Sequence, residues 1–174
     1  MGLDMYARTL RADLAPDQQT DVDVLGVALG AADPDLADSA AMEARYAAAD
    51  HNSELRALLT SQVAAARKKL QEEGIANMEF AYWRKFNHLH GWMEQLYRDK
   101  GGQSECFNLV TVRVDRPDLD KLEAQASQLS PKSGFFFGDT RPLEAADVQA
   151  ILQFTKLARE AIDKGHAVFY DSWW

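Results

Sequence analysis

The stretch from Glu79 to Tyr97 constrains the fold of this chain more than any other. Six aromatic side chains and two histidines lie within it. Its apolar side chains recur every three or four residues, at Tyr82, Phe86, Leu89, Met93 and Leu96. This spacing predicts a helix over about 77–99, with these side chains in the core and polar side chains on the opposite arc.

Patterning elsewhere predicts a mixture of helices and strands. Alternating or β-branched apolar residues predict short strands, at 1–8, 22–29, 106–114 and 166–174. Helical periodicity predicts further helices, at 53–73, 118–129 and 143–164. Because these elements follow no regular βαβ rhythm, we expect an α+β fold. We expect one domain over 1–174, in which about three main helices pack on a small mixed or antiparallel sheet, with an acidic, loop-rich insertion at about 10–52.

Charge and composition disfavour two classes of function. The net charge is −8, from 27 acidic and 19 basic residues, and a field of this sign repels the phosphates of nucleic acids. The acidity serves solubility or, alternatively, docking on a basic surface of another protein. No apolar run reaches the roughly 18 residues that a membrane span needs, so we expect no membrane partner. The single cysteine, Cys106, cannot form an intramolecular bridge, which fits a reducing cytoplasm.

The polar arc of the predicted helix is the first candidate site. Arg84, Asn87 and His88 fall together on a helical wheel, with Lys85 beside them and Gly91 leaving space. Arginine and lysine bind anions, and histidine also transfers protons near neutral pH. The alternative is a solvated face with no role.

The histidines do not predict a metal site. His88 and His90 are about 200° apart on a helical wheel and cannot reach one ion, so we expect no metal and no cofactor. His90 is predicted to be a hydrogen-bonded structural residue. Cys106 is predicted to be a small buried side chain rather than a nucleophile.

A glycine-bracketed segment, Gly134 to Gly138, is the second candidate site. Gly138 would let a ligand approach the backbone, and Arg141 would then meet an anion. It lacks the spacing of a phosphate-binding loop. The alternative is that its three phenylalanines fill the core.

Four stretches give the chain a family resemblance: Met-Gly-Leu-Asp-Met-Tyr at 1–6, Tyr-Trp-Arg-Lys-Phe-Asn-His-Leu-His-Gly-Trp at 82–92, Ser-Gly-Phe-Phe-Phe-Gly-Asp-Thr at 133–140 and Phe-Tyr-Asp-Ser-Trp at 169–173. They resemble a family of small bacteriophage and prophage proteins of uncharacterised activity. The resemblance covers both ends and the middle, whereas residues 10–60 depart from the family pattern. It implies an accessory protein in the bacterial cytoplasm, and it implies no catalytic residue. It directs attention to the family's recurring side chains, here Asp4, Tyr82, Trp83, Arg84, Lys85, Asn87, His88, Trp92, Gly134, Phe136, Gly138 and Trp173.

Two functions are therefore expected, in order of preference. The first is a non-enzymatic protein that binds and modulates a cytosolic bacterial or phage protein through the Arg84/His88 arc, the acidic segment or the terminal tryptophans. The second is a small-ligand or nucleotide-binding protein or enzyme, with an anion pocket between helix 77–99 and the 134–141 turn. A deep pocket lined by Arg84, His88 and Arg141 would favour the second function.

Overall fold

The computed structural model describes residues 2–29, 63–133 and 141–174. Within these ranges the chain forms five α-helices, one 3-10 helix and four strands. In chain order the elements are β1 (Asp4–Arg11), η1 (Ala12–Leu14), α1 (Gln19–Leu29), α5 (Val63–Glu72), β2 (Ala76–Arg84), α6 (Asn87–Asp99), β3 (Thr111–Val114), α7 (Arg116–Gln125), α8 (Ala145–Asp163) and β4 (His166–Trp173).

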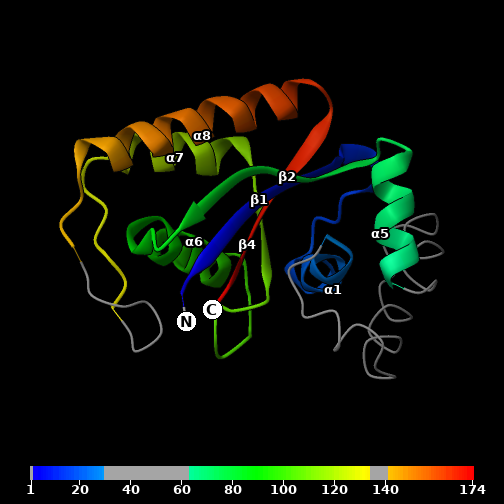
Figure 1. Ribbon diagram of the computed structural model, residues 1–174, viewed down its shortest axis with the longest axis horizontal. Helices are drawn as coiled ribbons and strands as arrows, with labels where there is room; N and C mark the ends of the chain where they lie inside the picture. The colour runs from blue at the N-terminus through cyan, green and yellow to red at the C-terminus, as the bar shows by residue number, and fades with distance from the viewer. Residues whose placement is uncertain (1, 30–62, 134–140) are drawn as a thin grey trace.

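The four strands form one antiparallel sheet in the order β2-β1-β4-β3. The first and last strands of the chain pair along their whole length, from Asp4 opposite Trp173 to Arg11 opposite His166. Figure 1 shows the two described ends of the chain side by side as a result. The predicted α+β fold is confirmed, and the sheet is antiparallel rather than mixed.

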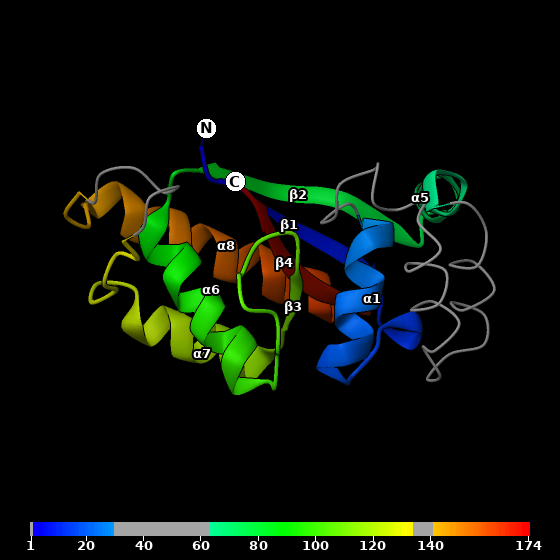
Figure 2. The same cartoon turned by 90° about the horizontal axis from the view of Figure 1, so that it is seen from below.

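The helices divide between the two faces of the sheet (Figure 2). Helices α6, α7 and α8 cover one face, which we call the covered face. Helix α1 lies on the other face beside β3, where the Gln19 side chain donates to the carbonyl of Thr111 over 2.7 Å. The rest of that second face, near the described chain ends, carries no described helix.

The core fills the space between the sheet and the three helices of the covered face. Side chains from every second strand position enter it, because neighbours along a strand point to opposite faces. Phe154 of α8 is buried and packs edge-on against Trp83, with ring centroids 5.2 Å apart. It also stacks on Phe80 at 6.1 Å, so α8 is held to β2 by aromatic contacts.

The predicted helix over 77–99 is wrong in its first half. Residues 76–84 form β2, and helix α6 begins only at Asn87. Pairing with β1 gives this segment its backbone hydrogen bonds, and such long-range pairing overrides a local pattern. Lys85 lies between the two elements with a φ of 57°, a left-handed conformation that turns the chain from strand to helix.

Two other expectations are corrected in the described residues. The predicted strand at 22–29 lies in helix α1, so the 10–52 segment is less loop-rich than expected; residues 30–52 lie outside the described ranges. The strand predicted at 106–114 is limited to β3. The helix predicted at 53–73 appears as α5 in its described part and is followed by Gly74, whose φ is 69°.

The predictions at 118–129, 143–164 and 166–174 agree with the structure, whereas the segment from Gly134 to Gly138 lies outside the described residues. Helix α8 lies within the predicted 143–164, and α7 begins two residues before the predicted 118. Both helices start with a reciprocal capping box, Asp115 with Asp118 in α7 and Glu144 with Asp147 in α8.

Candidate functional site

Arg84 and Lys85, two of the predicted site residues, lie at the end of β2. The Arg84 side chain is 64% exposed, and its Nε lies 3.8 Å from Oδ1 of Asp4 on the neighbouring strand. The side chains of Arg84 and Lys85 both lie beside Gly2, where a Cβ would be 3.3 Å from Nη2 of Arg84. The two cationic side chains therefore lie at one corner of the sheet.

Asn87 and His88 occupy the first turn of α6 and are buried, so the prediction that they lie on an exposed arc is wrong. The His88 ring packs edge-on against Phe86 at 6.1 Å. Burial lowers the pKa of His88, while the nearby charges of Asp147 and Arg141 act in opposite directions. Lys132 fills the space beside Gly91. A Cβ added to Gly91 would lie 3.1 Å from the Cβ of Lys132.

Arg141 precedes helix α8 and forms an ion pair with Asp147 in the first turn of that helix. Its guanidinium donates to both carboxylate oxygens of Asp147, over 2.5 and 2.6 Å. This contact is the main cause that holds the pKa of Asp147 below its usual value. Asp147 also accepts from the backbone N–H of Glu144, so Arg141 stabilises the cap of the helix. Gly138, the remaining predicted site residue, lies outside the described ranges.

The predicted anion pocket is thus divided between two places. Arg84 and Lys85 lie on the sheet, whereas Arg141 and His88 share the neighbourhood of Asp147 at the start of α8. Arg84 lies near Asp4 on an exposed surface of the sheet and not inside the core.

Side chains that sequence reasoning did not group lie around Arg84. The strand register places Asp4 between Arg84 on β2 and Trp173 on β4, and Tyr6 next to Tyr82. We call these five residues the open face: Asp4, Tyr6, Tyr82, Arg84 and Trp173. A sequence signal for the open face exists, because its five residues lie in three of the four stretches that carry the family resemblance. The helical interpretation of residues 77–84 concealed it by assigning Tyr82 to the core.

Direct contacts fix the aromatic side chains of the open face. The Tyr82 hydroxyl donates to Oδ1 of Asp4 over 2.5 Å, and the rings of Tyr6 and Tyr82 are 5.4 Å apart. The hydrogen bond to Asp4 raises the pKa of Tyr82. Burial, followed by the charge of Asp4, raises the pKa of Tyr6. Both phenols therefore stay neutral at physiological pH and act as hydrogen-bonding aromatic groups rather than as nucleophiles.

A buried ion pair supports the open face from beside Tyr6. Nε of Arg8 donates to Asp171 over 2.6 Å, and its Nη2 lies 3.4 Å from the other carboxylate oxygen. The same guanidinium donates to the carbonyl of Met78 and lies 4.7 Å from the centre of the Tyr6 ring. Because Arg8 spans β1, β2 and β4, it holds the three strands of the open face in one arrangement.

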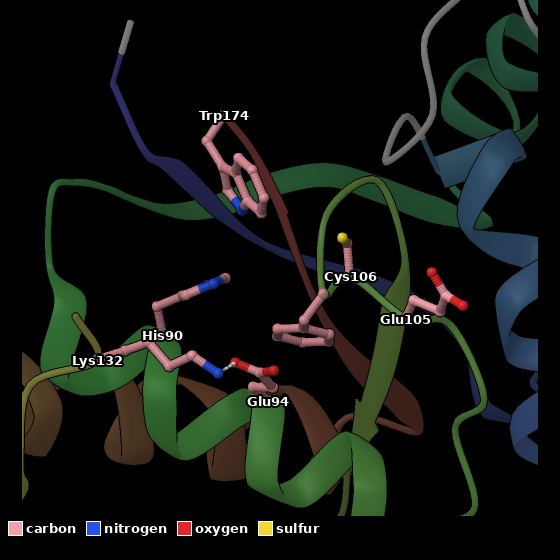
Figure 3. A pocket seen from close by; sticks show the side chains of 7 residues that line it. His90, Glu94, Glu105, Cys106, Lys132 and Trp174 are labelled. Atoms are coloured by element: carbon pink, nitrogen blue, oxygen red, sulfur yellow. Dashed lines mark ion pairs between the residues drawn. The ribbon is translucent and has the colours of Figure 1, made fainter. Parts of the chain in front are cut away.

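A small cavity of about 170 Å³ lies beside α6, next to His90 and Glu94 (Figure 3). Four chain segments line it, through His90, Glu94, Glu105, Cys106, Phe107, Lys132 and Trp174. Lys132 is paired with Glu94, so the charged side chain that remains in the lining is the acidic Glu105. Cys106 is exposed, contrary to the prediction of a buried thiol.

His90 is the structural histidine that the sequence predicted. It is buried, and its Nδ1 lies within hydrogen-bond distance of the Tyr170 hydroxyl, at 3.0 Å. Burial, with a smaller effect of Lys132, lowers the pKa of His90 to about 3. The imidazole is therefore neutral at physiological pH and is not a proton donor in this cavity.

The described part of the chain contains no cluster of three or more His, Cys, Asp or Glu side chains able to hold a metal ion. Among the same residues, no helix is both long and apolar enough to span a bilayer.

The open face combines aromatic, cationic and acidic groups on a rigid sheet, and this chemistry suits recognition of another molecule. Comparison with family models, curated proteins and solved structures gave no match to the chain.

Proposed function

We propose that this protein is a phage or prophage accessory protein that binds and modulates a cytosolic bacterial protein without catalysing a reaction, and that the open face is its binding surface. One observation carries the proposal. Of the large apolar side chains in the described residues, the exposed ones are Tyr82 (46%) and Trp173 (56%), and both belong to the open face.

The composition of the open face supports this function. Tryptophan, tyrosine and arginine are the residues that most often dominate binding energy at protein interfaces. Here Trp173, Tyr82 and Arg84 come from two strands that flank β1 on either side and share Asp4 as a neighbour. Their backbones are fixed by the sheet, so a partner would not have to order them on binding.

The test is a quantitative capture experiment from bacterial lysate, read by mass spectrometry. The tagged protein is compared with the Arg84→Ala/Trp173→Ala variant and with Arg116→Ala/Lys121→Ala, a control that removes exposed cations from α7. We expect one partner in stoichiometric amount that the open-face variant loses and the control keeps. A partner retained by the open-face variant would contradict the proposal.

The cavity beside His90 favours a second candidate function, small-ligand binding. Its volume is about 170 Å³, below the usual range for drug-sized ligands, so a nucleotide is too large for it. Glu105 and the Lys132–Glu94 pair leave a net negative lining, which favours a small neutral or cationic ligand over an anion.

A fragment screen by thermal shift tests this second function. We expect small aromatic or cationic fragments to stabilise the protein, and the effect to disappear in Cys106→Phe, which fills the cavity from its exposed side. Fragments that stabilise both proteins equally would place the binding site elsewhere and contradict this candidate.

A further inference from the structure

Strand β2 is an outer strand of the sheet. It pairs with β1 on one side, and within the described residues no strand pairs with it on the other (Figure 2). An outer strand presents unpaired backbone N–H and C=O groups, which are a template for another strand.

The hydrogen-bond pattern identifies which backbone groups point outward. The Lys85 N–H donates to the carbonyl of Leu3 over 2.8 Å, so Lys85 faces β1. In an antiparallel pair, consecutive residues alternate between bonding to the partner and pointing away from it. Trp83 therefore faces β1 as well, opposite Met5, and the N–H and C=O groups of Tyr82 and Arg84 point to the free edge.

The free edge is regular over only part of β2. Ala81 pairs with Ala7 and Asn77 with Thr9, so that Arg8 alone lies opposite residues 78–80. Such an irregularity disrupts further pairing along an edge. The stretch from Ala81 to Arg84 keeps regular pairing and lies next to the open face.

The side chains along this stretch indicate what kind of strand would fit. Arg84 and Lys85 place two positive charges at its end, against one negative charge from Asp4 at 3.8 Å from Arg84, so this corner keeps a net positive charge. Trp83 and Ala81 point to the covered face and offer apolar contacts there.

We infer that the partner adds an extended segment to the Ala81–Arg84 edge of β2, with acidic side chains beside Tyr82 and Arg84 and apolar side chains beside Trp83. This inference rests on the proposed protein-binding function and specifies its mode. Backbone hydrogen bonds from Tyr82 and Arg84 would supply affinity, and the alternating side chains would supply selectivity.

The experiment uses short synthetic peptides in which valine alternates with glutamate, and a matched set in which valine alternates with lysine. Amide hydrogen exchange is followed by NMR in the full-length protein. In the free protein we expect fast exchange at Tyr82 and Arg84 and slow exchange at Trp83 and Lys85. The glutamate peptides should slow exchange at Tyr82 and Arg84 and bind at least about fivefold more tightly than the lysine peptides.

Three outcomes would overturn the inference. The first is unchanged exchange at Tyr82 and Arg84 with every peptide. The second is that a glutamate peptide N-methylated at alternate residues binds as tightly as the unmethylated peptide. The third is slowed exchange that depends only on protein concentration, which would indicate a second copy. Competition separates this inference from the proposed function. If the lysate partner depends on Trp173 but is not displaced by the glutamate peptide, open-face binding stands and strand addition fails.

Discussion

Alternate residues of the same strands enter two different environments. Met5 and Trp83, paired across β1 and β2, point toward helices α6 to α8 and pack in the core. Their neighbours Asp4 and Arg84, also paired, point to the open face and remain polar. The covered face therefore stabilises the fold, whereas the open face leaves aromatic and charged groups available to a partner. Substitutions on the two faces should differ in kind, affecting folding on one and binding on the other.

The largest effect is expected on the covered face, at Phe154. Phe154→Ala removes a buried ring that contacts both Phe80 and Trp83, and it should lower the free energy of unfolding by about 4 kcal/mol. Urea denaturation measures this change. A loss below about 1 kcal/mol would mean that the two faces do not differ as described.

The next effect concerns the buried ion pair beside the open face. Asp171→Ala leaves the Arg8 charge buried without its carboxylate and should cost about 3 kcal/mol. The double variant Arg8→Met/Asp171→Leu should regain most of that stability, because it removes both charges. If the single and double variants are equally unstable, the loss does not come from an uncompensated Arg8 charge, and this explanation is wrong.

The buried His90 should make the stability of the covered face depend on pH. Its pKa is about 3 in the folded protein against 6.5 for the unperturbed group, so below pH 6.5 the unfolded chain binds a proton that the folded protein does not. The free energy of unfolding should therefore decrease by about 2 to 3 kcal/mol as the pH is lowered from neutral to about 4.5. His88, whose pKa is also lowered, acts in the same direction.

Denaturation curves at several pH values measure this loss, and NMR of the imidazole gives the control. The His90 ring should remain neutral throughout that interval. Protonation of the folded His90 near pH 6.5 would contradict its placement in the core.

The smallest effect on stability is expected at the open face. Trp173→Ala removes a side chain that is 56% exposed and should change the free energy of unfolding by less than about 1 kcal/mol. A thermal denaturation curve checks this. A cooperative loss of the fold would show that Trp173 supports the sheet and is not available to a partner.

The sequence predicted the fold class and the C-terminal elements because their patterns are local. Helix α8 has a regular apolar side and a capping box, and β4 contains a continuous apolar run at 167–170. It did not predict β2, where Tyr82 and Phe86 match helical spacing although Tyr82 lies in the strand and Phe86 is the residue before α6. The irregular pairing opposite Arg8 also removes the alternation that would have identified a strand.

The candidate site was predicted only in part for the same reason. The sequence predicts Arg84 and Lys85 as site residues and the terminal tryptophans as one candidate binding surface. Their proximity depends on strand pairing between the two ends of the chain, which one sequence does not show. The exposure of His88 was predicted wrongly, because a helix beginning at Asn87 has its first turn packed against Phe86 and near the start of α8.

Two tryptophans on opposite faces provide the most direct test of the central claim. Trp83→Ala and Trp173→Ala remove the same side chain, one from the covered face and one from the open face. For each variant we would measure the free energy of unfolding and the calorimetric affinity for the captured partner. The account predicts that Trp83→Ala loses stability and only the small share of affinity that the apolar contacts beside Trp83 supply, whereas Trp173→Ala keeps its stability and loses most of its affinity. Equal affinity of Trp173→Ala and the unaltered protein for the partner would contradict it.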